Sequence, residues 1–337
     1  MSAIVDYFRK FNNYINLLNQ SGENLSKTQC AIDGIVSFII FGSTITDYFE
    51  LSFWNKTLFE KAKYATWRLH KRFIYEVDEI ATIERLTNKY NMYDTLKKYV
   101  NREQLYSKVM SFDDFADYCT RHSMFFAKPC NNSCGEGIER IDVNLEDLDS
   151  LYLRLIKEET ILESPIVQHH DMLELNHSSV NTLRIFTYRV NDCIYYTGCA
   201  LRIGTTGYID NYSAGGLVCS VDLKTGKTKA KAENHLGQRF SEHPLSHVKL
   251  ESFQVPRWNE VIDYVFQMAQ NYDLNYVAWD IAVEENGVDL VEANPAGMIN
   301  VIQIAGGDPK KEIIKSLEKE WKKDPGKKNT QYKMILC

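Results

Sequence analysis

The pattern of apolar and polar positions divides the chain into an N-terminal part with helical spacing and a longer part with strand spacing. Residues 1–110 mix aromatic and basic side chains and are typical of helices. Within them, the segment 81–100 places apolar side chains at steps of three and four, at Ile83, Leu86, Tyr90, Tyr93 and Leu96. This spacing predicts one amphipathic helix over 81–100.

From about Phe112 the pattern changes to short β-branched and aromatic runs, which predict strands. The runs cover residues 124–129, 164–170, 181–190, 193–203, 217–223, 276–283 and 288–294. Turn signals such as Asn191–Asp192 separate several of them, and helical stretches at about 144–158, 257–273 and 309–323 intervene. The pattern therefore predicts a helical N-terminal part followed by a mixed, largely antiparallel α+β part.

Composition limits the class of protein without naming a function. The 337 residues are 44% hydrophobic and 25% charged, with a net charge of −6, which argues against a general nucleic-acid binder. The N-terminus has no signal-peptide pattern. The longest apolar run, 35–41, is far short of the roughly 20 residues of a membrane-spanning helix. We expect a cytoplasmic protein without a membrane span.

The segment 278–297, AWDIAVEENGVDLVEANPAG, places acids inside apolar strands. A turn at Glu285–Asn286–Gly287 predicts a hairpin, and strands paired around it would bring Asp280 close to Glu292. Glu292 and Asn294 are two residues apart and share a face. Close carboxylates need a cation between them, and these oxygen donors suit Mg²⁺ carrying nucleotide phosphates. The other interpretation is an exposed hairpin with ordinary surface acids.

Two further segments carry basic residues beside glycines. Lys128 ends an apolar run and precedes the small-residue loop NNSCGEG, which can offer backbone N–H groups to phosphates, although such a lysine is more often structural. Arg184 and Arg202 lie on consecutive predicted strands before the segment DNYSAGG, 210–216. Single strand arginines usually pair with a carboxylate, but two beside a metal-type acidic pair favour a phosphate clamp.

Taken in order, these residues resemble the ATP-grasp superfamily, and the ending D…E-x-N-P-x-G is its most specific mark. The segments 33–54 and 166–188 are more similar to the sugar-transfer-associated ATP-grasp family, with motifs like those of the ribosomal-protein glutamate ligases. The resemblance implies an α+β ATP-grasp fold, two α+β subdomains gripping ATP, with a helical N-terminal region. The implied parts are a cap at 1–85, a first subdomain at 86–165, a second at 166–325 and a tail at 326–337.

The resemblance also assigns nucleotide contacts. The residues concerned are Lys89, Lys128, Gly135, Gly137, Gln168, His169, His170 and Asn181. Lys128 would contact the α-phosphate and the adenine end, and Lys89 would reach the nucleotide from the preceding part. The loop 135–137 would close over the β- and γ-phosphates. Gln168 and the backbone through the two histidines would read the adenine edge, with Asn181 or a neighbour near the ribose.

The assigned metal ligands, for one or two Mg²⁺ with Mn²⁺ as an alternative, are Asp280, Glu292 and Asn294. Arg184 and Arg202 would neutralise the γ-phosphate, and Asn211 would help to bind it. His169 and His170 are expected on a strand, where neighbours point to opposite faces, so a metal shared by the two is not expected. Adenine-pocket walls or plain strand residues are better interpretations.

These residues together lead to the hypothesis of an ATP- and Mg²⁺-dependent carboxylate–amine ligase that forms an amide through an acyl phosphate. Its substrate would be a sugar acid or an amino acid in polysaccharide or glycan biosynthesis, with a nucleotide sugar or glycan as a candidate partner. A kinase on the same fold and a non-catalytic nucleotide-binding protein are the alternatives. Residues 1–80 and 227–258 are candidate regions for acceptor recognition, and the oligomeric state stays open.

Overall fold

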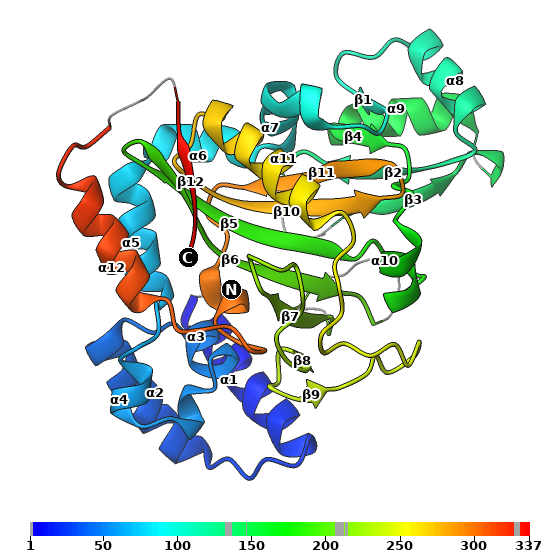
Figure 1. Cartoon of the computed structure of the whole chain (residues 1–337). Coiled ribbons are helices and arrows are strands. Elements are labelled where there is room, and N and C mark those ends of the chain that lie inside the picture. The colour runs from blue at the N-terminus through cyan, green and yellow to red at the C-terminus, as the bar shows by residue number, and fades with distance from the viewer. Residues whose placement is uncertain (1–2, 132–136, 146, 206–211, 213–214, 327–330) are drawn as a thin grey trace.

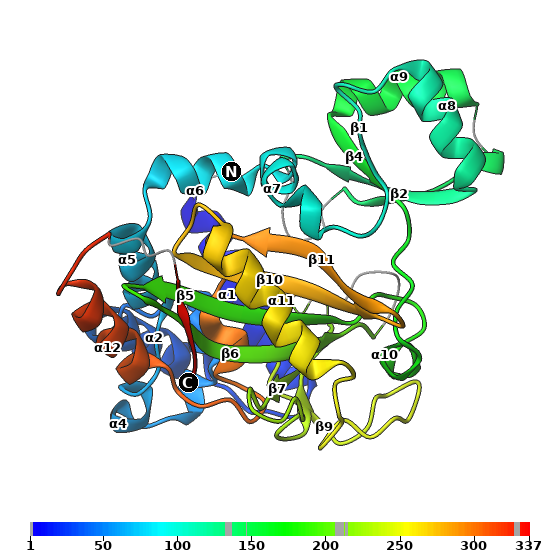
Figure 2. The same cartoon turned by 45° about the horizontal axis from the view of Figure 1, so that its top comes forward.

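The computed structural model describes residues 3–131, 137–145, 147–205, 212, 215–326 and 331–337. Two sheets organise these residues, one of four strands and one of eight. Figure 2 shows that the small sheet and two helices project from the bulk of the molecule. The N-terminal helices cover the opposite end, as Figure 1 shows. The predicted α+β fold with a helical N-terminal region is confirmed.

The small sheet has the strand order β1-β4-β2-β3 and is antiparallel. Its elements are β1 (Gln104–Tyr106), α8 (Phe112–Arg121), β2 (Met124–Pro129), β3 (Glu139–Asp142), η3 (Val143–Leu145), α9 (Leu148–Glu158) and β4 (Thr160–Glu163). Alternate residues of β2 point inward, so Phe125 and Ala127 are buried in a core of their own that includes Phe115 of α8 and Leu155 of α9.

The large sheet has the order β11-β10-β5-β6-β7-β8-β9, and β12 pairs with β6 in parallel. Its strands are β5 (Thr182–Val190), β6 (Cys193–Ile203), β7 (Leu217–Val221), β8 (Ala232–Glu233), β9 (Arg239–Phe240), β10 (Tyr276–Glu284), β11 (Gly287–Asn294) and β12 (Lys333–Leu336). Five predicted strands are confirmed here. The predicted strand 164–170 is wrong, because β4 ends at Glu163 and α10 (His170–Leu175) begins seven residues later, after a single bridge at Gln168.

Helices lie on both faces of the large sheet. On one face, Tyr272 follows α11 (Trp258–Asn271) and packs on Trp279 of β10. On the other face, His70 of α5 (Trp67–Val77) packs on Tyr276 of the same strand. The remaining helical elements are α1 (Ala3–Gln20), α2 (Lys27–Phe41), α3 (Ile45–Glu50), η1 (Phe53–Asn55), α4 (Leu58–Lys61), α6 (Ile80–Thr87), α7 (Lys89–Leu96), η2 (Lys97–Tyr99), η5 (Ile299–Ile302) and α12 (Lys311–Trp321).

The single helix predicted over 81–100 is two helices. Asn88 has extended backbone angles, φ −69° and ψ 125°, and its side chain accepts a hydrogen bond from the Asn91 N–H, so it caps α7. The apolar spacing continues across Asn88, so the sequence pattern predicted one continuous helix. Because of this break, Lys89 is the first residue of α7. The Lys89 backbone N–H donates a hydrogen bond to the carbonyl of Cys130, which lies just beyond β2.

Candidate active site

The acidic hairpin forms as predicted. β10 and β11 pair antiparallel, with Asp280 directly opposite Glu292 and Ala278 opposite Asn294. The three polar side chains therefore share one face of the sheet. Gly297 follows at a close approach, because a Cβ built there would lie 2.5 Å from the Cβ of Ala278. The glycine in E-x-N-P-x-G thus lets the chain fold back over the hairpin.

Asp280 receives two guanidinium groups from the neighbouring strands. Arg184 donates through Nε and Nη2 to the two carboxylate oxygens at 2.7 and 2.6 Å, and Arg202 donates to Oδ2 at 2.9 Å. Only 3% of Asp280 is exposed. Burial by itself would raise the pKa of this carboxyl, but the two arginines outweigh it and hold the pKa below its ordinary value. Asp280 is therefore ionised at neutral pH.

Glu292 and Asn294 complete the face. The Glu292 carboxylate lies 3.1 Å from Nζ of Lys89, the first residue of α7. The Asn294 amide donates to Asp280 Oδ2 at 3.3 Å and to the Ala278 carbonyl at 3.3 Å. The structure thus brings Lys89, which lies about 200 residues earlier in the chain, to the predicted metal ligands.

Lys128, at the end of β2, does not contact the acidic hairpin directly. Its Nζ lies 2.6 Å from the carboxylate of Glu163, the last residue of β4, which is 2% exposed. Burial would raise the pKa of Glu163, but Arg102 and Lys128 dominate and lower it. Glu163 was not among the predicted site residues.

Arg102 links the two sheets through hydrogen bonds. Like Glu163, it was not among the predicted site residues. Its Nε and Nη2 donate to Glu163 at 2.9 and 3.0 Å, and its Nη1 donates to Asp289 Oδ2 of β11 at 2.6 Å. Nη1 also donates to the Leu290 carbonyl at 2.7 Å. One guanidinium therefore links the partner of Lys128 to the strand that carries Glu292. The signal in the sequence was weak, since Arg102 lies in a polar stretch between elements.

The segment 168–181 runs beside the end of β10. Gln168 pairs with Glu284, and the His169 N–H donates to the Val283 carbonyl. The Gln168 side chain accepts from the Asn181 N–H at 2.7 Å and donates to the Ser179 carbonyl at 2.8 Å. The Asn181 side chain is fully buried and also bonds inside this segment. The side chains of Gln168 and Asn181 therefore hold the segment 168–181 together through hydrogen bonds. Their contacts with a nucleotide remain a prediction.

His169 and His170 do not lie on a strand, which corrects the expectation that they point to opposite faces. His169 caps α10 and His170 is its first residue, so both rings lie on one side, stacked at 4.3 Å with 25° between their planes. His170 Nδ1 lies 2.8 Å from Glu285, which raises the pKa of this imidazole. The two imidazoles and the Asp171 carboxylate each offer one ligand atom, and these atoms lie within 4.8 Å of one another, so the geometric reason for not expecting a metal shared by the two histidines no longer holds.

Two predicted contacts, Gly135 and Asn211, lie outside the described residues. Gly137 is described and has φ +76°, a left-handed conformation that favours glycine. Its part in closing over phosphates stays a prediction.

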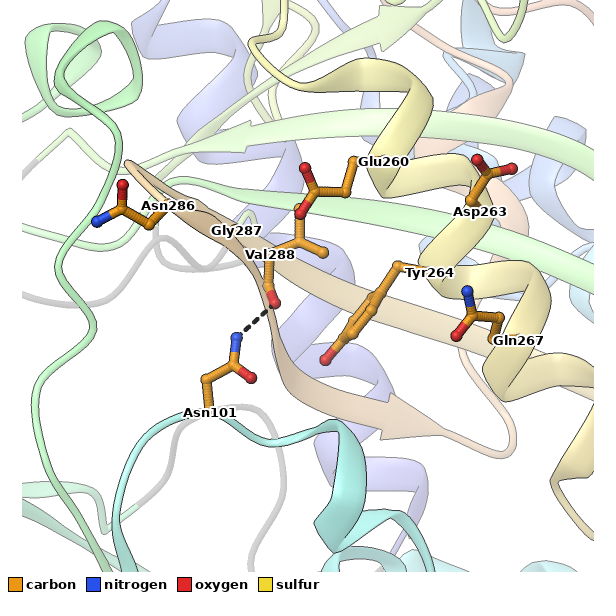
Figure 3. Close-up of a pocket in the computed structure, with 8 residues that line it drawn as sticks. All are labelled: Asn101, Glu260, Asp263, Tyr264, Gln267, Asn286, Gly287 and Val288. Carbon is orange, nitrogen blue, oxygen red and sulfur yellow. Dashed lines mark hydrogen bonds between the residues drawn. The ribbon is translucent and has the colours of Figure 1, made fainter.

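A surface cavity of about 590 Å³ contains none of the predicted site residues. Figure 3 shows it between α11, the start of β11 and Asn101, whose amide donates to the Val288 carbonyl at 2.8 Å. It lies beside α11, against the sheet face opposite Asp280, because Asp280 and Trp279 are adjacent and point to opposite faces. Its carboxylates, among them Asp263, are exposed.

The N-terminal helices contact the segment that follows the hairpin through a buried acid. Glu50 of α3 is 9% exposed and accepts a hydrogen bond from the Asn300 amide at 2.9 Å. Burial raises the pKa of Glu50 to about 7; the Asn300 hydrogen bond lowers it in part, and nearby Asp47 adds to the rise. This carboxyl therefore titrates near neutral pH in the folded protein.

Glu50→Gln is expected to stabilise the protein at pH 8 but not at pH 4. The folded protein holds the Glu50 proton more tightly than the unfolded chain. Its contribution to stability is therefore full below pH 4.5 and is lost as the pH rises through about 7, at a cost of about 3 kcal/mol. Glutamine cannot ionise and still accepts from Asn300. Denaturant unfolding at both pH values measures the effect, with exposed Glu23→Gln as control; equal shifts at both pH values would contradict it.

The donor set fits a nucleotide with a divalent cation. Asp280, Glu292 and Asn294 offer hard oxygens on one face, and each carboxylate oxygen has two acceptor positions, so the arginine contacts leave capacity for an ion. Lys89, Arg184 and Arg202 supply positive charge at the same place. An acidic pair surrounded by cations in this way is suited to a phosphate chain and its Mg²⁺.

The fold and this site define an enzyme of the ATP-grasp class. The sequence profile described as sugar-transfer associated ATP-grasp matches residues 68–319. Since that is most of the chain, the protein belongs to the sugar-transfer-associated ATP-grasp family. No curated protein matches the sequence. Among the described residues, no helix is long and apolar enough to cross a membrane.

Similar solved structures include ATP-grasp ligases, at low identity. The ATP-grasp ligase PsnB, complexed with a phosphomimetic variant of its minimal precursor, Mg and ADP, is 12% identical with a TM-score of 0.44. The match covers 71% of this chain and 60% of PsnB. N5-carboxyaminoimidazole synthetase from Staphylococcus aureus, complexed with ADP, is 12% identical over 64% of this chain and 46% of its own, with a TM-score of 0.41. Likeness at this level carries no conclusion about substrate.

Proposed function

We propose that the protein is an ATP- and Mg²⁺-dependent carboxylate–amine ligase that acts on a sugar acid or an amino acid in glycan biosynthesis. The observation that carries the proposal is the convergence of Arg184 and Arg202 on Asp280, directly opposite Glu292. Family membership supplies the ATP-grasp chemistry, and its sugar-transfer association supports the substrate class.

The residues have distinct parts in the proposed reaction. Lys89 and Lys128 bind the nucleotide phosphates, and Arg184 and Arg202 offset the charge on the γ-phosphate as the substrate carboxylate attacks it. The attack gives an acyl phosphate and ADP; an amine then displaces phosphate and forms the amide. Mg²⁺, held by Asp280, Glu292 and Asn294, would supply charge neutralisation on the phosphate oxygens. No nucleophile of the protein is needed, because positioning and charge provide the catalysis.

The proposal is tested by incubating the purified protein with Mg²⁺, ATP and panels of uronic acids, nucleotide-sugar acids, amino acids and amines. We expect ADP and free phosphate in equal amounts, only when an acid and an amine are both present. Mass spectrometry should show a product equal to acid plus amine minus water.

Other outcomes identify the alternatives. A kinase would produce ADP and a phosphorylated hydroxyl compound without free phosphate. A non-catalytic protein would bind ATP, measured by calorimetry, but release no ADP with any pair. Either result contradicts the ligase proposal.

A further inference from the structure

Helix α2 has its polar side inward and its apolar side outward. Five large apolar side chains of this helix are between 56% and 69% exposed: Ile32, Ile35, Phe38, Ile39 and Ile40. The inward side carries Asp33 and Ser37, which accept hydrogen bonds from Lys61 of α4. Because the polar side of α2 packs inward, the exposure of its apolar side chains is not explained by incomplete burial at the edge of a core. They form a continuous apolar face, which we call the α2 face.

Helix α4 extends this surface. Lys61 is 1% exposed and holds α4 against α2 through Asp33, and Figure 1 shows the two helices together at one corner of the molecule. Leu58 and Phe59 of α4 are 51% and 74% exposed. The seven side chains together expose the equivalent of about four whole ones, or roughly 700 Å² at the ~150–250 Å² that a large side chain can bury. That is close to the ~800 Å² that each partner contributes to a standard interface.

The chemistry of the α2 face favours a second copy of the chain as its occupant. Between Thr28 and Phe41 the only charged side chain is Asp33, which faces inward. Depletion of charge is typical of the core of homodimer interfaces. The spacing of Ile32, Ile35 and Ile39 makes a ridge along the helix, which can pack on the same ridge of a helix related by a two-fold axis.

A lipid surface is less suited to this face. Helices that lie on membranes carry Lys and Arg beside their apolar residues, with Trp or Phe at the interface. The outward positions of α2 carry no cation, and beside the apolar residues of α4 a single lysine, Lys63, lies over the Phe59 ring. We therefore propose that the protein forms a symmetric homodimer in which the α2 faces of two copies pack against each other. The inference does not depend on the ligase activity.

The experiment is light scattering coupled to size exclusion, over a range of concentrations. The wild-type chain should have twice its 39.1 kDa monomer mass. Ile35→Glu combined with Ile39→Glu should shift it to the monomer mass with unchanged circular dichroism, because these side chains are 59% and 69% exposed in the monomer. Leu153→Glu, which changes a side chain of α9 that is 67% exposed, should remain a dimer.

A second variant tests the geometry. Near a two-fold axis the same residue lies opposite itself, so Ile39→Cys should form a disulfide-linked dimer under mild oxidation, and Leu153→Cys should not. A wild-type monomer at all concentrations, or a dimer that persists in the double variant, would overturn the proposal. A monomer that binds phosphatidylcholine–phosphatidylglycerol vesicles through Ile35 and Ile39 would overturn it too and assign the face to lipid.

Discussion

Asp280→Asn is expected to reduce ADP release by about 10²–10³-fold or more, while ATP binding falls much less. Asp280 is the proposed metal ligand on which Arg184 and Arg202 converge. Asparagine keeps the shape of the side chain but removes its charge, so the metal and both arginines lose their anionic partner. Turnover is measured by coupled ADP detection and nucleotide binding by calorimetry.

Stability must be measured beside activity, because Asp280→Asn leaves two guanidinium groups without a carboxylate in a buried place. Breaking a buried pair in this way costs about 3–5 kcal/mol. Glu292→Gln separates the two effects, since the Glu292 side chain is 28% exposed and its loss should affect folding less. Asp263→Asn, on the opposite face, is the matched control and should change neither quantity. Turnover within about threefold of wild type in both site variants would contradict the proposed metal site.

Arg102→Met is expected to destabilise the protein by about 3–5 kcal/mol, because it leaves the buried carboxylates of Glu163 and Asp289 without their shared cation. The KM for ATP should also rise, since Glu163 would hold Lys128 in a changed position. Arg102→Lys should recover only part of both losses, because an ammonium group cannot bridge two carboxylates as a guanidinium does. Denaturant unfolding and steady-state kinetics measure the two effects.

A matched surface variant and a double variant make this test specific. Arg121→Met breaks an exposed pair with Glu103 and should cost no more than about 1 kcal/mol. In Arg102→Met, Glu163 keeps Lys128 as its partner, whereas Asp289 loses its cation. Arg102→Met together with Asp289→Asn removes this uncompensated charge and should be more stable than Arg102→Met alone. If the double variant is less stable than the single one, the charge explanation is wrong.

The sequence predicted the acidic hairpin because its turn and its strand pattern are local. Asp280 and Glu292 lie twelve positions apart around the turn, and alternation along β5 and β6 places Arg184 and Arg202 on the same face. The register that starts at the turn pairs Ile281 with Leu290 and would place Val291 opposite Asp280. A bulge between Asp280 and Ile281 shifts the pairing by one residue and brings Glu292 opposite Asp280, and the sequence pattern did not predict this bulge. The same reasoning failed at 164–170, where apolar residues line a connection between the sheets and the only pairing is one bridge.

By itself, then, the sequence determined the helical and strand-rich parts, the carboxylate pair and the two arginines that face it. Only the tertiary structure decided that Arg102 joins Glu163 to Asp289, 187 residues away, and that Glu50 meets Asn300 across 250 residues. It also decided that α2 turns its apolar side outward. The reason is physical: periodicity tells which face of an element is apolar, but burial and charge pairing depend on which faces of distant elements meet.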